Sequence, residues 1–251
     1  MTTAPLAIVT GGKRRLGAEI AAKLAEAGYA LALVSHIDSA PEAALAEALD
    51  AYKSQWRAFT FDLSAGDPAD LIGAVFGHFG RTPDVLVNNA AMFGQDDWQS
   101  MTLDTLEAHF RLNLFSPLLL AKALVHAAGA QARPVVVNIL DQRIVNPHGD
   151  QVSYTLSKQA LAASVRSMAA AFAGRARYNG VAPGLVISTD DYTQQQESRL
   201  AKMMPLGALP SPSAVADAVV YLANAQDVTG QVIFVDGGAH LKSFDRDFMH
   251  L

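Results

Sequence analysis

The order of strand-like and helix-like stretches constrains the fold of this chain more than any other feature. Short runs rich in valine, isoleucine and leucine are predicted to form strands at 6–10, 29–34, 58–61, 84–90, 134–140, 177–183 and 231–237. Alanine-rich amphipathic stretches between them are predicted to form helices at 15–28, 41–54, 67–79, 102–129, 153–173 and 212–225. Strand followed by helix, repeated along a chain, is typical of a parallel sheet covered on both faces. We therefore expect an α/β fold with a doubly wound, seven-stranded parallel sheet.

The sequence contains no internal repeat, low-complexity tract or linker that would separate two domains. Its 251 residues, of which 51% are hydrophobic, are enough to bury a full core. We expect one domain spanning residues 1–251. The one irregular segment, 184–213, is polar and contains prolines. Because such segments often form lids over active sites, we expect it to be a substrate loop.

Composition and charge exclude several classes of function. The formal net charge of -5 provides no basic surface for nucleic acid or for an acidic membrane. Without cysteine there are no disulfides or thiolate ligands, and the 7 histidines lack the close spacing of a metal site. The sequence has neither a membrane-length apolar run nor an N-terminal signal peptide. We expect a soluble cytoplasmic protein that acts on a small molecule.

A glycine-rich turn, TGGKRRLG at 10–17, follows the first predicted strand and opens the first predicted helix. Amides at the N-terminus of such a helix can bind a pyrophosphate, as in Rossmann-type dinucleotide sites. Gly11 and Gly12 let the backbone approach the phosphates, and Gly17 lets the helix pack closely on the sheet. For the turn alone, a tight connection without a ligand is the alternative. The order strand, turn, helix favours a Rossmann-type cofactor site.

Residues around this turn favour NADPH over NADH as the cofactor. Adjacent cations at a helix N-terminus oppose the helix dipole, so a nearby anion would explain them. The cations are Lys13, Arg14 and Arg15. After the second strand, Ser35 and His36 occupy the region where NAD-binding proteins have an acid for the ribose 2′-hydroxyl. This pattern favours the 2′-phosphate of NADPH, and a solvated basic turn is the alternative.

A tyrosine and a lysine four positions apart suggest acid–base chemistry. In the predicted helix 153–173, Tyr154 and Lys158 project from one face. An ammonium near a phenol stabilises the phenolate, so we expect Lys158 to lower the pKa of Tyr154 toward a catalytic range. Lys158 could also hydrogen-bond the ribose of a nicotinamide cofactor. Taken alone, the pair could equally be a surface tyrosine beside a surface lysine.

Several short motifs together resemble the short-chain dehydrogenase/reductase family. They are TGGKRRLG at 10–17, Asp62 after the third strand, NNAA at 88–91, Asn113, YTLSK at 154–158, VAPG at 181–184 and VDGG at 235–238. These motifs occur in that family's order and spacing and span nearly the whole chain. The resemblance implies a Rossmann-type fold, an NAD(P)(H)-dependent oxidoreductase, and a homotetramer built from helices 102–129 and 153–173.

The resemblance also implies roles for individual residues. Asn89 and Ala90 would line the adenosine ribose of the cofactor, Asp62 and Leu63 its adenine, and Pro183 and Gly184 its nicotinamide. Asn113 would hold a water in a proton relay that runs through Lys158 to Tyr154. The full predicted cofactor site is Gly11, Lys13, Arg14, Arg15, Leu16, Ser35, His36, Asp62, Leu63, Asn89, Ala90, Tyr154, Lys158, Pro183 and Gly184.

Asp141 stands thirteen positions before Tyr154, where most members of that family have a serine that polarises a ketone. An ionised carboxylate about 4 Å from a developing alkoxide would cost roughly 4 kcal/mol at an effective dielectric of about 20. Ordinary ketone reduction is therefore disfavoured. A protonated carboxyl can donate to a nitrogen heterocycle and an ionised one can accept from its N–H, so either form suits protonation of a ring nitrogen. Alternatively, Asp141 only caps the loop after the fifth strand.

Within the family, an aspartate at this position is similar to pteridine reductases and dihydromonapterin reductases. Those enzymes also carry Thr-Gly-x-x-x-Arg-x-Gly in the first turn, which matches Thr10, Gly11, Arg15 and Gly17. Phe93 stands where they stack an aromatic ring on the pterin, although it could also be a core phenylalanine at a strand end. The stretch 184–191 is similar to their substrate loop, which gives Leu185 a contact with the ring. The predicted substrate site is Arg15, Phe93, Asp141, Tyr154 and Leu185, and the predicted catalytic residues are Asn113, Asp141, Tyr154 and Lys158.

Three hypotheses about function follow. The first is an NADPH-dependent reductase of a pterin or dihydropterin, with dihydrobiopterin, dihydromonapterin or dihydrofolate as substrate. The second is a carbonyl reductase or alcohol dehydrogenase in which Asp141 is structural. The third is a dinucleotide-sensing protein without turnover, against which the intact set of Asn113, Tyr154 and Lys158 argues.

Overall fold

A seven-stranded parallel sheet forms the centre of the computed structural model, which describes residues 4–187 and 192–251. The strands are β1 (Leu6–Thr10), β2 (Ala30–Ser35), β3 (Trp56–Thr60), β4 (Val85–Asn88), β5 (Val135–Ile139), β6 (Arg177–Pro183) and β7 (Val232–Val235). Their order is β3-β2-β1-β4-β5-β6-β7, and every neighbouring pair is parallel. The strand order reverses between β1 and β4, which is where ligands bind in such sheets. The predicted doubly wound sheet is confirmed.

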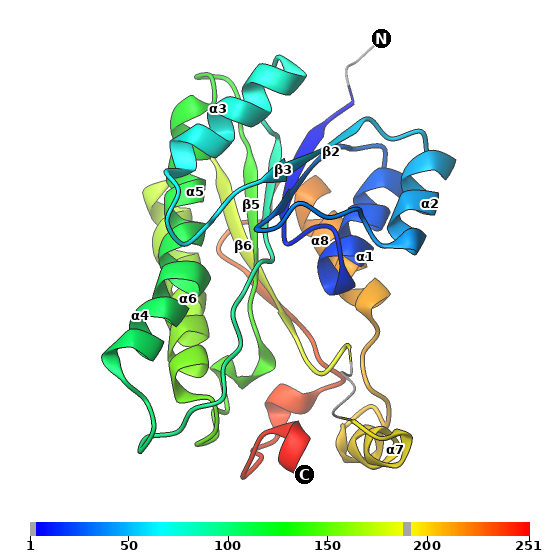
Figure 1. The fold of residues 1–251 in the computed structure, drawn as a ribbon, viewed down its shortest axis with the longest axis vertical. Helices are drawn as coiled ribbons and strands as arrows, with labels where there is room; N and C mark the ends of the chain where they lie inside the picture. The colour runs from blue at the N-terminus through cyan, green and yellow to red at the C-terminus, as the bar shows by residue number, and fades with distance from the viewer. Residues whose placement is uncertain (1–3, 188–191) are drawn as a thin grey trace.

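Helices cover both faces of this sheet, as Figure 1 shows. On one face lie α1 (Arg15–Glu26), α2 (Ala43–Ala51) and α8 (Pro212–Asn224). On the other lie α3 (Pro68–Phe79), α4 (Leu103–Phe110), α5 (Ser116–Ala127) and α6 (Val152–Ala171). The remaining helix, α7 (Gln194–Met203), lies at the lower end of Figure 1 with the C-terminus.

Alternation of side chains along the strands creates a separate core on each face. In β1, Ala7 and Val9 join the cluster that contains the buried side chains of α1 and α8, whereas Leu6 and Ile8 join the cluster of α3, α5 and α6. All four are fully buried. Because complete burial of one valine or leucine side chain contributes about 1.5–3 kcal/mol, these two clusters fix the sheet that positions the site.

The predicted single helix 102–129 is instead divided. A short π-helical turn, η1 (Arg111–Phe115), separates α4 from α5 and contains the buried Asn113. The side chain of Asn113 donates to Met92 O at 2.9 Å and accepts from Met92 N at 2.8 Å. Such turns often occur at functional sites, and the apolar periodicity of the sequence continues through them.

The segment 184–213, predicted to be irregular, contains helix α7. Thr193 caps this helix, because its side chain accepts a hydrogen bond from Gln196 N at 3.2 Å. Leu200 buries the apolar side of α7 against Met204, Ala239 and Phe248. Helix α7 was not predicted because its sequence is polar and rich in glutamine. Residues 188–191 of the predicted substrate loop lie outside the described residues.

Beyond β7 the chain turns back toward α7. A 3-10 helix, η3 (Ala239–Leu241), is followed by residues 242–251, which we call the tail, with a second 3-10 helix η4 (Phe248–His250). Asn146 Nδ2 donates to His240 O at 2.6 Å and holds η3 near the loop after β5. The tail therefore lies at the same end of the molecule as the carboxyl ends of the strands (Figure 1).

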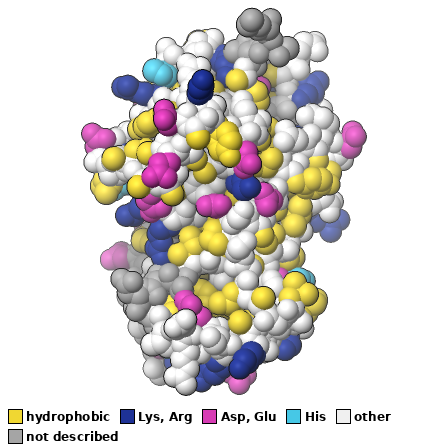
Figure 2. Space-filling model, turned by 90° about the vertical axis from the view of Figure 1, so that its right-hand side faces the viewer, with side chains coloured by type: hydrophobic (Ala, Val, Ile, Leu, Met, Phe, Trp, Pro, Cys, Tyr) yellow, Lys and Arg dark blue, Asp and Glu magenta, His cyan; other side chains and the backbone are white. Residues whose placement is uncertain are grey.

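The surface carries charges of both signs. On the face drawn in Figure 2, Lys and Arg side chains alternate with Asp and Glu, and hydrophobic side chains form small groups. Over residues 4–187 and 192–251, no helix is long and apolar enough to span a membrane. The same residues contain no group of three or more histidine, aspartate or glutamate side chains that could hold a metal ion.

Candidate active site

A cleft of about 630 Å³ opens at the carboxyl ends of β1, β2 and β4. Its walls include most of the predicted cofactor residues: Gly11, Lys13, Arg14, Arg15, Leu16, Ser35, His36, Asp62, Leu63, Asn89 and Ala90. The other four members of that predicted set, Tyr154, Lys158, Pro183 and Gly184, lie outside this lining. The structure thus brings the residues of the glycine-rich turn together with those that follow β2, β3 and β4.

The glycines of the first turn are required by close backbone approaches. A Cβ atom on Gly17 would lie 2.0 Å from Gly11 O, and one on Gly12 would lie 2.7 Å from Val9 O. Gly11 has a φ of 63°. Asn89 fixes the turn to β4, because its Nδ2 donates to Thr10 O at 2.9 Å. The result is a narrow backbone cradle at the N-terminus of α1, which fits a pyrophosphate.

Arg15 adopts a conformation that side chains rarely take. Its φ is 54°, in the left-handed region where many dinucleotide-binding loops have glycine, and this costs about 1 kcal/mol. Its N–H donates to Glu42 Oε1 at 2.9 Å, which supports the strained backbone. Arg14 and Arg15 are both exposed. The conformation holds a cation at the mouth of the cleft.

Lys13 has a different position from its two cationic neighbours. It is only 3% exposed, and its Nζ donates to Ser39 O at 2.6 Å and to Ile37 O at 3.3 Å. The ammonium therefore holds the loop after β2. Ser35 Oγ donates to Ile37 O at 2.8 Å within the same loop. Among the lining residues of the cleft the only carboxylate is Asp62, whose Oδ1 lies 3.9 Å from His36 Nδ1.

A second cavity, of about 310 Å³, lies beside the first residues of α6. It is lined by Phe93, Gln95, Asp141, Gln142, Arg143, Tyr154, Gly184, Leu185, Ile187, Tyr192, Asp247, Phe248 and Met249. Four of the predicted substrate residues, Phe93, Asp141, Tyr154 and Leu185, therefore share one cavity, together with Gly184 from the predicted cofactor site. The fifth, Arg15, lines the larger cleft.

Asp141 and Tyr154 form the polar centre of this cavity. Tyr154 Oη donates to Asp141 Oδ2 at 2.9 Å. Asp141 Oδ1 accepts from Arg143 N at 2.9 Å and from Arg143 Nε at 3.3 Å. Each of these contacts uses the carboxyl group as an acceptor.

The expected effect of Lys158 on Tyr154 is wrong. Burial raises the pKa of Tyr154 well above its usual value, and the negative charge of Asp141 raises it further, while Arg143 opposes the shift. Lys158 Nζ donates instead to Ile139 O at 2.7 Å and lies 5.8 Å from the centre of the Tyr154 ring. The buried phenol is therefore neutral and holds a proton that it can donate.

Lys158 is buried, and its ammonium loses a proton at a lower pH than an exposed lysine does. Desolvation lowers its pKa to about 8, and Asp141 opposes this shift by favouring the charged form. Its position on α6 follows from Tyr154 being one turn earlier, as the spacing predicted. A lysine with this pKa is partly neutral at physiological pH and is suited to pass a proton on.

Asn113 connects the segment after β4 with α6. Besides its bonds to Met92, its Nδ2 donates to Ser157 Oγ at 3.0 Å, and Ser157 Oγ donates to Tyr154 O at 2.6 Å. Both N–H groups of the Asn113 amide are engaged by these protein atoms. Its predicted role in holding a relay water stays a prediction.

Phe93 stands at the entrance to the cavity and is not a core residue. Its side chain is 47% exposed, and its ring lies 4.8 Å from that of Tyr154 at an interplanar angle of 73°. An exposed aromatic ring at this place can stack on a planar ligand.

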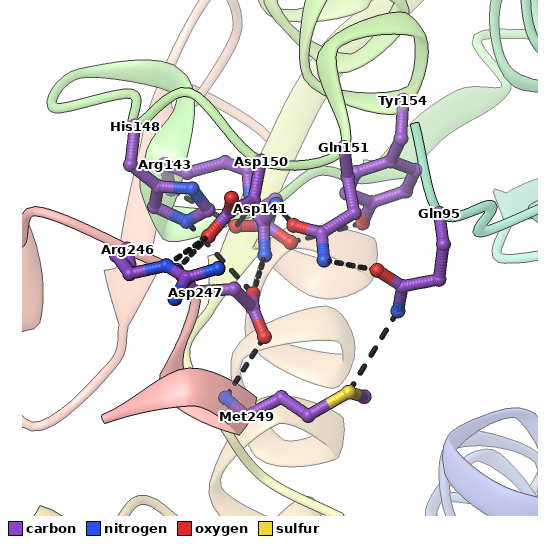
Figure 3. Close-up of polar contacts among 10 residues, drawn as sticks. All are labelled: Gln95, Asp141, Arg143, His148, Asp150, Gln151, Tyr154, Arg246, Asp247 and Met249. Carbon is purple, nitrogen blue, oxygen red and sulfur yellow. Dashed lines mark hydrogen bonds and ion pairs between the residues drawn. The ribbon is translucent and has the colours of Figure 1, made fainter. Parts of the chain in front are cut away.

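Sequence reasoning missed Arg143 and the tail. The guanidinium of Arg143 donates to Gln151 Oε1 at 3.0 Å and to Asp247 Oδ2 at 2.6 Å, as Figure 3 shows. It also lies 5.6 Å from the ring centre of Phe93 and 5.3 Å from that of Tyr154. The position of Arg143, two residues after Asp141, was only a weak indication that it belongs to the site. No local sequence pattern indicates that it pairs with Asp247, 104 positions away.

Comparisons with known proteins agree with this architecture. The family model described as enoyl-(acyl carrier protein) reductase matches residues 11–240. Pteridine reductase 1 of Leishmania tarentolae is 31% identical, over 95% of this chain and 97% of that protein. The 3-oxoacyl-[acyl-carrier-protein] reductase of Homo sapiens is 29% identical, over 93% and 97% respectively. The crystal structure of FolM alternative dihydrofolate reductase 1 from Brucella suis in complex with NADP matches with a TM-score of 0.86 and 30% identity, over 98% of both chains.

Proposed function

The chain belongs to the short-chain dehydrogenase/reductase family, and we propose that it is an NADPH-dependent reductase of a pterin or dihydropterin. Dihydrobiopterin, dihydromonapterin and dihydrofolate are the substrates to test first. Relatives named as a pteridine reductase and as an alternative dihydrofolate reductase support this choice. The single observation that carries it is the carboxyl group of Asp141, whose Oδ2 accepts a hydrogen bond from Tyr154 Oη inside the smaller cavity.

The larger cleft fits the cofactor that the family implies. Its glycine cradle leaves room for a pyrophosphate at the N-terminus of α1, where the helix dipole favours an anion. Arg14 and Arg15 are the exposed cations closest in sequence to that cradle and suit a further phosphate group, and a solved relative is named as a complex with NADP. When bound, NADPH supplies the hydride that reduces a ring carbon.

The proton would come from the residues of the smaller cavity. Tyr154 is neutral and buried, so it can give its proton to a ring nitrogen of the substrate. Asp141 would accept from an N–H of the same ring, because both of its oxygens already act as acceptors. Lys158, with a pKa of about 8, would return a proton to Tyr154 along α6.

Two further residues would orient the substrate. Phe93 offers an exposed ring that can stack on a planar heterocycle, and Leu185 lines the same cavity. Arg15 lies on the larger cleft and would act from the cofactor side.

We also propose that the segment 184–213 acts as a lid, since Leu185, Ile187 and Tyr192 line the cavity.

Carbonyl reduction is the second candidate, because one relative is named as a 3-oxoacyl-[acyl-carrier-protein] reductase. The geometry disfavours it. A developing alkoxide that accepts from Tyr154 would lie near the Asp141 carboxyl group, whose Oδ2 is 2.9 Å from the tyrosine oxygen, and a carboxylate there would repel it. At about 4 Å this repulsion costs roughly 4 kcal/mol at an effective dielectric of about 20. A dinucleotide-sensing protein without turnover is the third candidate.

The experiment that tests the proposal measures NADPH oxidation with the three pterin substrates and with a short 3-oxoacyl thioester. Asp141→Ser is assayed in parallel, with the exposed Asp245→Ser as the matched control. We expect wild-type turnover of at least one pterin, a collapse in Asp141→Ser and no change in the control. Turnover confined to the thioester, with Asp141→Ser equal or better, would assign carbonyl reduction.

We propose in addition that the protein acts in the cytoplasm as a homotetramer. The helices expected at the interface, α5 and α6, expose apolar side chains: Leu119 is 47% and Leu156 is 42% exposed, and Phe115 beside α5 is 48% exposed. Light scattering of the purified protein tests this state, and a monomeric mass would contradict it.

A further inference from the structure

Arg143 is a buried cation between two carboxylates. Its side chain is 6% exposed, Nε lies 3.3 Å from Asp141 Oδ1, and Nη2 lies 2.6 Å from Asp247 Oδ2. Nη1 donates to Gln151 Oε1 at 3.0 Å. A buried charge is stable only when it is paired and hydrogen-bonded, so the position of the guanidinium depends on each of these partners.

Asp247 brings the tail into this network, as Figure 3 shows. Its Oδ1 accepts from Met249 N at 2.9 Å, and its own N–H donates to Asp150 Oδ2 at 2.8 Å. His148 Nε2 lies 3.8 Å from Asp247 Oδ2. Burial lowers the pKa of His148, and Arg143 lowers it further, so the histidine adds little positive charge near neutral pH. Arg143 is therefore the cation that holds Asp247.

The tail also forms a wall of the smaller cavity. Asp247, Phe248 and Met249 are among its lining residues. Gln196 of α7 donates to Met249 O at 3.0 Å, and Gln95 Nε2 lies 3.8 Å from Met249 Sδ. The tail thus contacts both α7 and the segment after β4 that carries Phe93.

We propose that Asp247 is a positioning residue: through Arg143 it holds Asp141 against Tyr154, and it keeps the tail in place as a wall of the substrate cavity. This inference rests on the proposed reductase activity of the same cavity. It assigns the tail, rather than only the sequence motifs of the family, a part in substrate recognition.

Loss of the Asp247 charge has a defined consequence. In Asp247→Asn the guanidinium is balanced by Asp141 alone, so it moves toward that carboxylate and Asp141 no longer aligns with Tyr154 Oη. The tail loses its buried ion pair with Arg143, keeps only the more exposed pair between Arg246 and Asp150, and opens. A displacement of about 1 Å at a reacting group can lower turnover by about a hundredfold. NADPH affinity stays unchanged, because the tail does not line the larger cleft.

The test compares wild type, Asp247→Asn, Asp247→Glu and the control Asp245→Asn. Asp245 and Arg246 are exposed, so the control removes a charge next to the network without touching it. Two quantities are measured: kcat and KM for every pterin and 3-oxoacyl substrate that the wild type reduces, and the rate of tryptic cleavage after Arg246. The NADPH dissociation constant is determined for each variant.

We expect Asp247→Asn to lose about tenfold to a hundredfold in kcat/KM and to be cleaved at least about tenfold faster, with NADPH affinity unchanged. Asp247→Glu retains the charge and restores most of both properties, and Asp245→Asn behaves as wild type. Unchanged kinetics or unchanged cleavage in Asp247→Asn would overturn the proposal, as would an Asp247→Glu variant that is equally impaired. A wild type that reduces only the thioester defeats the pterin assignment alone: the tail still lines the cavity, so Asp247→Asn must then still be cleaved faster and show a higher KM for the thioester.

Discussion

The larger cleft and the smaller cavity are built in different ways. The cleft is shaped by backbone: the close approaches at Gly12 and Gly17 and the hydrogen bonds between Asn89 and Thr10 define it. The cavity is shaped by charged side chains from distant segments, with Asp141 and Asp247 on either side of Arg143. A contiguous motif can specify the first kind of site, whereas the second depends on which side chains the fold buries together.

Because of this difference, mutations in the two regions should impair the protein in two distinct ways. A change in the backbone cradle should remove cofactor binding and leave no activity to measure. A change in the cavity should leave cofactor binding intact and affect turnover. The variants below test whether the two regions are as independent as their construction suggests.

The largest effect is expected from Gly17→Val. A Cβ atom at this position would lie 2.0 Å from Gly11 O, so the turn and the start of α1 must move apart. We expect loss of measurable NADPH binding in a fluorescence titration. Gly73→Ala in α3 is the control, because its Cβ would meet nothing within 4 Å and should stabilise the helix by about 0.5–1 kcal/mol. Normal NADPH affinity in Gly17→Val would show that the cradle is not the cofactor site.

Tyr154→Phe should affect only the cavity. Removal of the proton donor is expected to lower kcat by about 100- to 10 000-fold, while the dissociation constant of NADPH changes by less than about threefold. The surface variant Tyr52→Phe serves as control, since Tyr52 is 48% exposed. Product formation at the wild-type rate by Tyr154→Phe would exclude the proposed acid–base chemistry.

The pH dependence of kcat/KM tests the role of Lys158. Its pKa is lowered to about 8, so the ammonium is present below pH 8 and is lost as pH rises through that value. Tyr154 does not titrate there, because its pKa is raised well above the usual value. We expect kcat/KM to fall about tenfold per pH unit above this limit. In Lys158→Arg the limit should disappear and kcat should fall, because a guanidinium stays charged and cannot pass its proton to Tyr154; an unmoved limit would assign it to another group.

Much of the fold could be predicted from the sequence for a physical reason. Strands buried on both faces must be nearly continuous apolar runs, so the bounds of β1 and β2 were predicted to within one residue. Helix α7 was missed because its stability depends on burial of Leu200 against Phe248 of the tail, a contact that local polarity conceals. The π-helical turn at Asn113 depends likewise on bonds to Met92, a residue from another element.

In the candidate site, too, local sequence motifs predict which residues take part but not how they are buried. Gly11, Asn89, Asp141, Tyr154 and Lys158 belong to short motifs. Gly11 and Asn89 line the cleft and Asp141 and Tyr154 line the cavity, whereas Lys158 lines neither and lies 5.8 Å from the centre of the Tyr154 ring. The shift in the pKa of Tyr154 had the opposite sign to the prediction, because desolvation and the charge of Asp141 outweigh the opposing effect of Arg143. Spacing on a helix indicates which groups share a face but not how deeply they are buried.

The smallest effect is expected from Arg15, where backbone strain and charge lie in one residue. Arg15→Gly relieves the strain of a φ of 54°, but glycine loses more entropy on folding, so the free energy of unfolding should change by less than about 1 kcal/mol. Arg15→Ala keeps the strain and removes only the charge. If the cation recognises the 2′-phosphate, both variants should lower the ratio of NADPH to NADH affinity by about three- to tenfold. An effect confined to Arg15→Gly would mean that the turn conformation, rather than the charge, selects the cofactor.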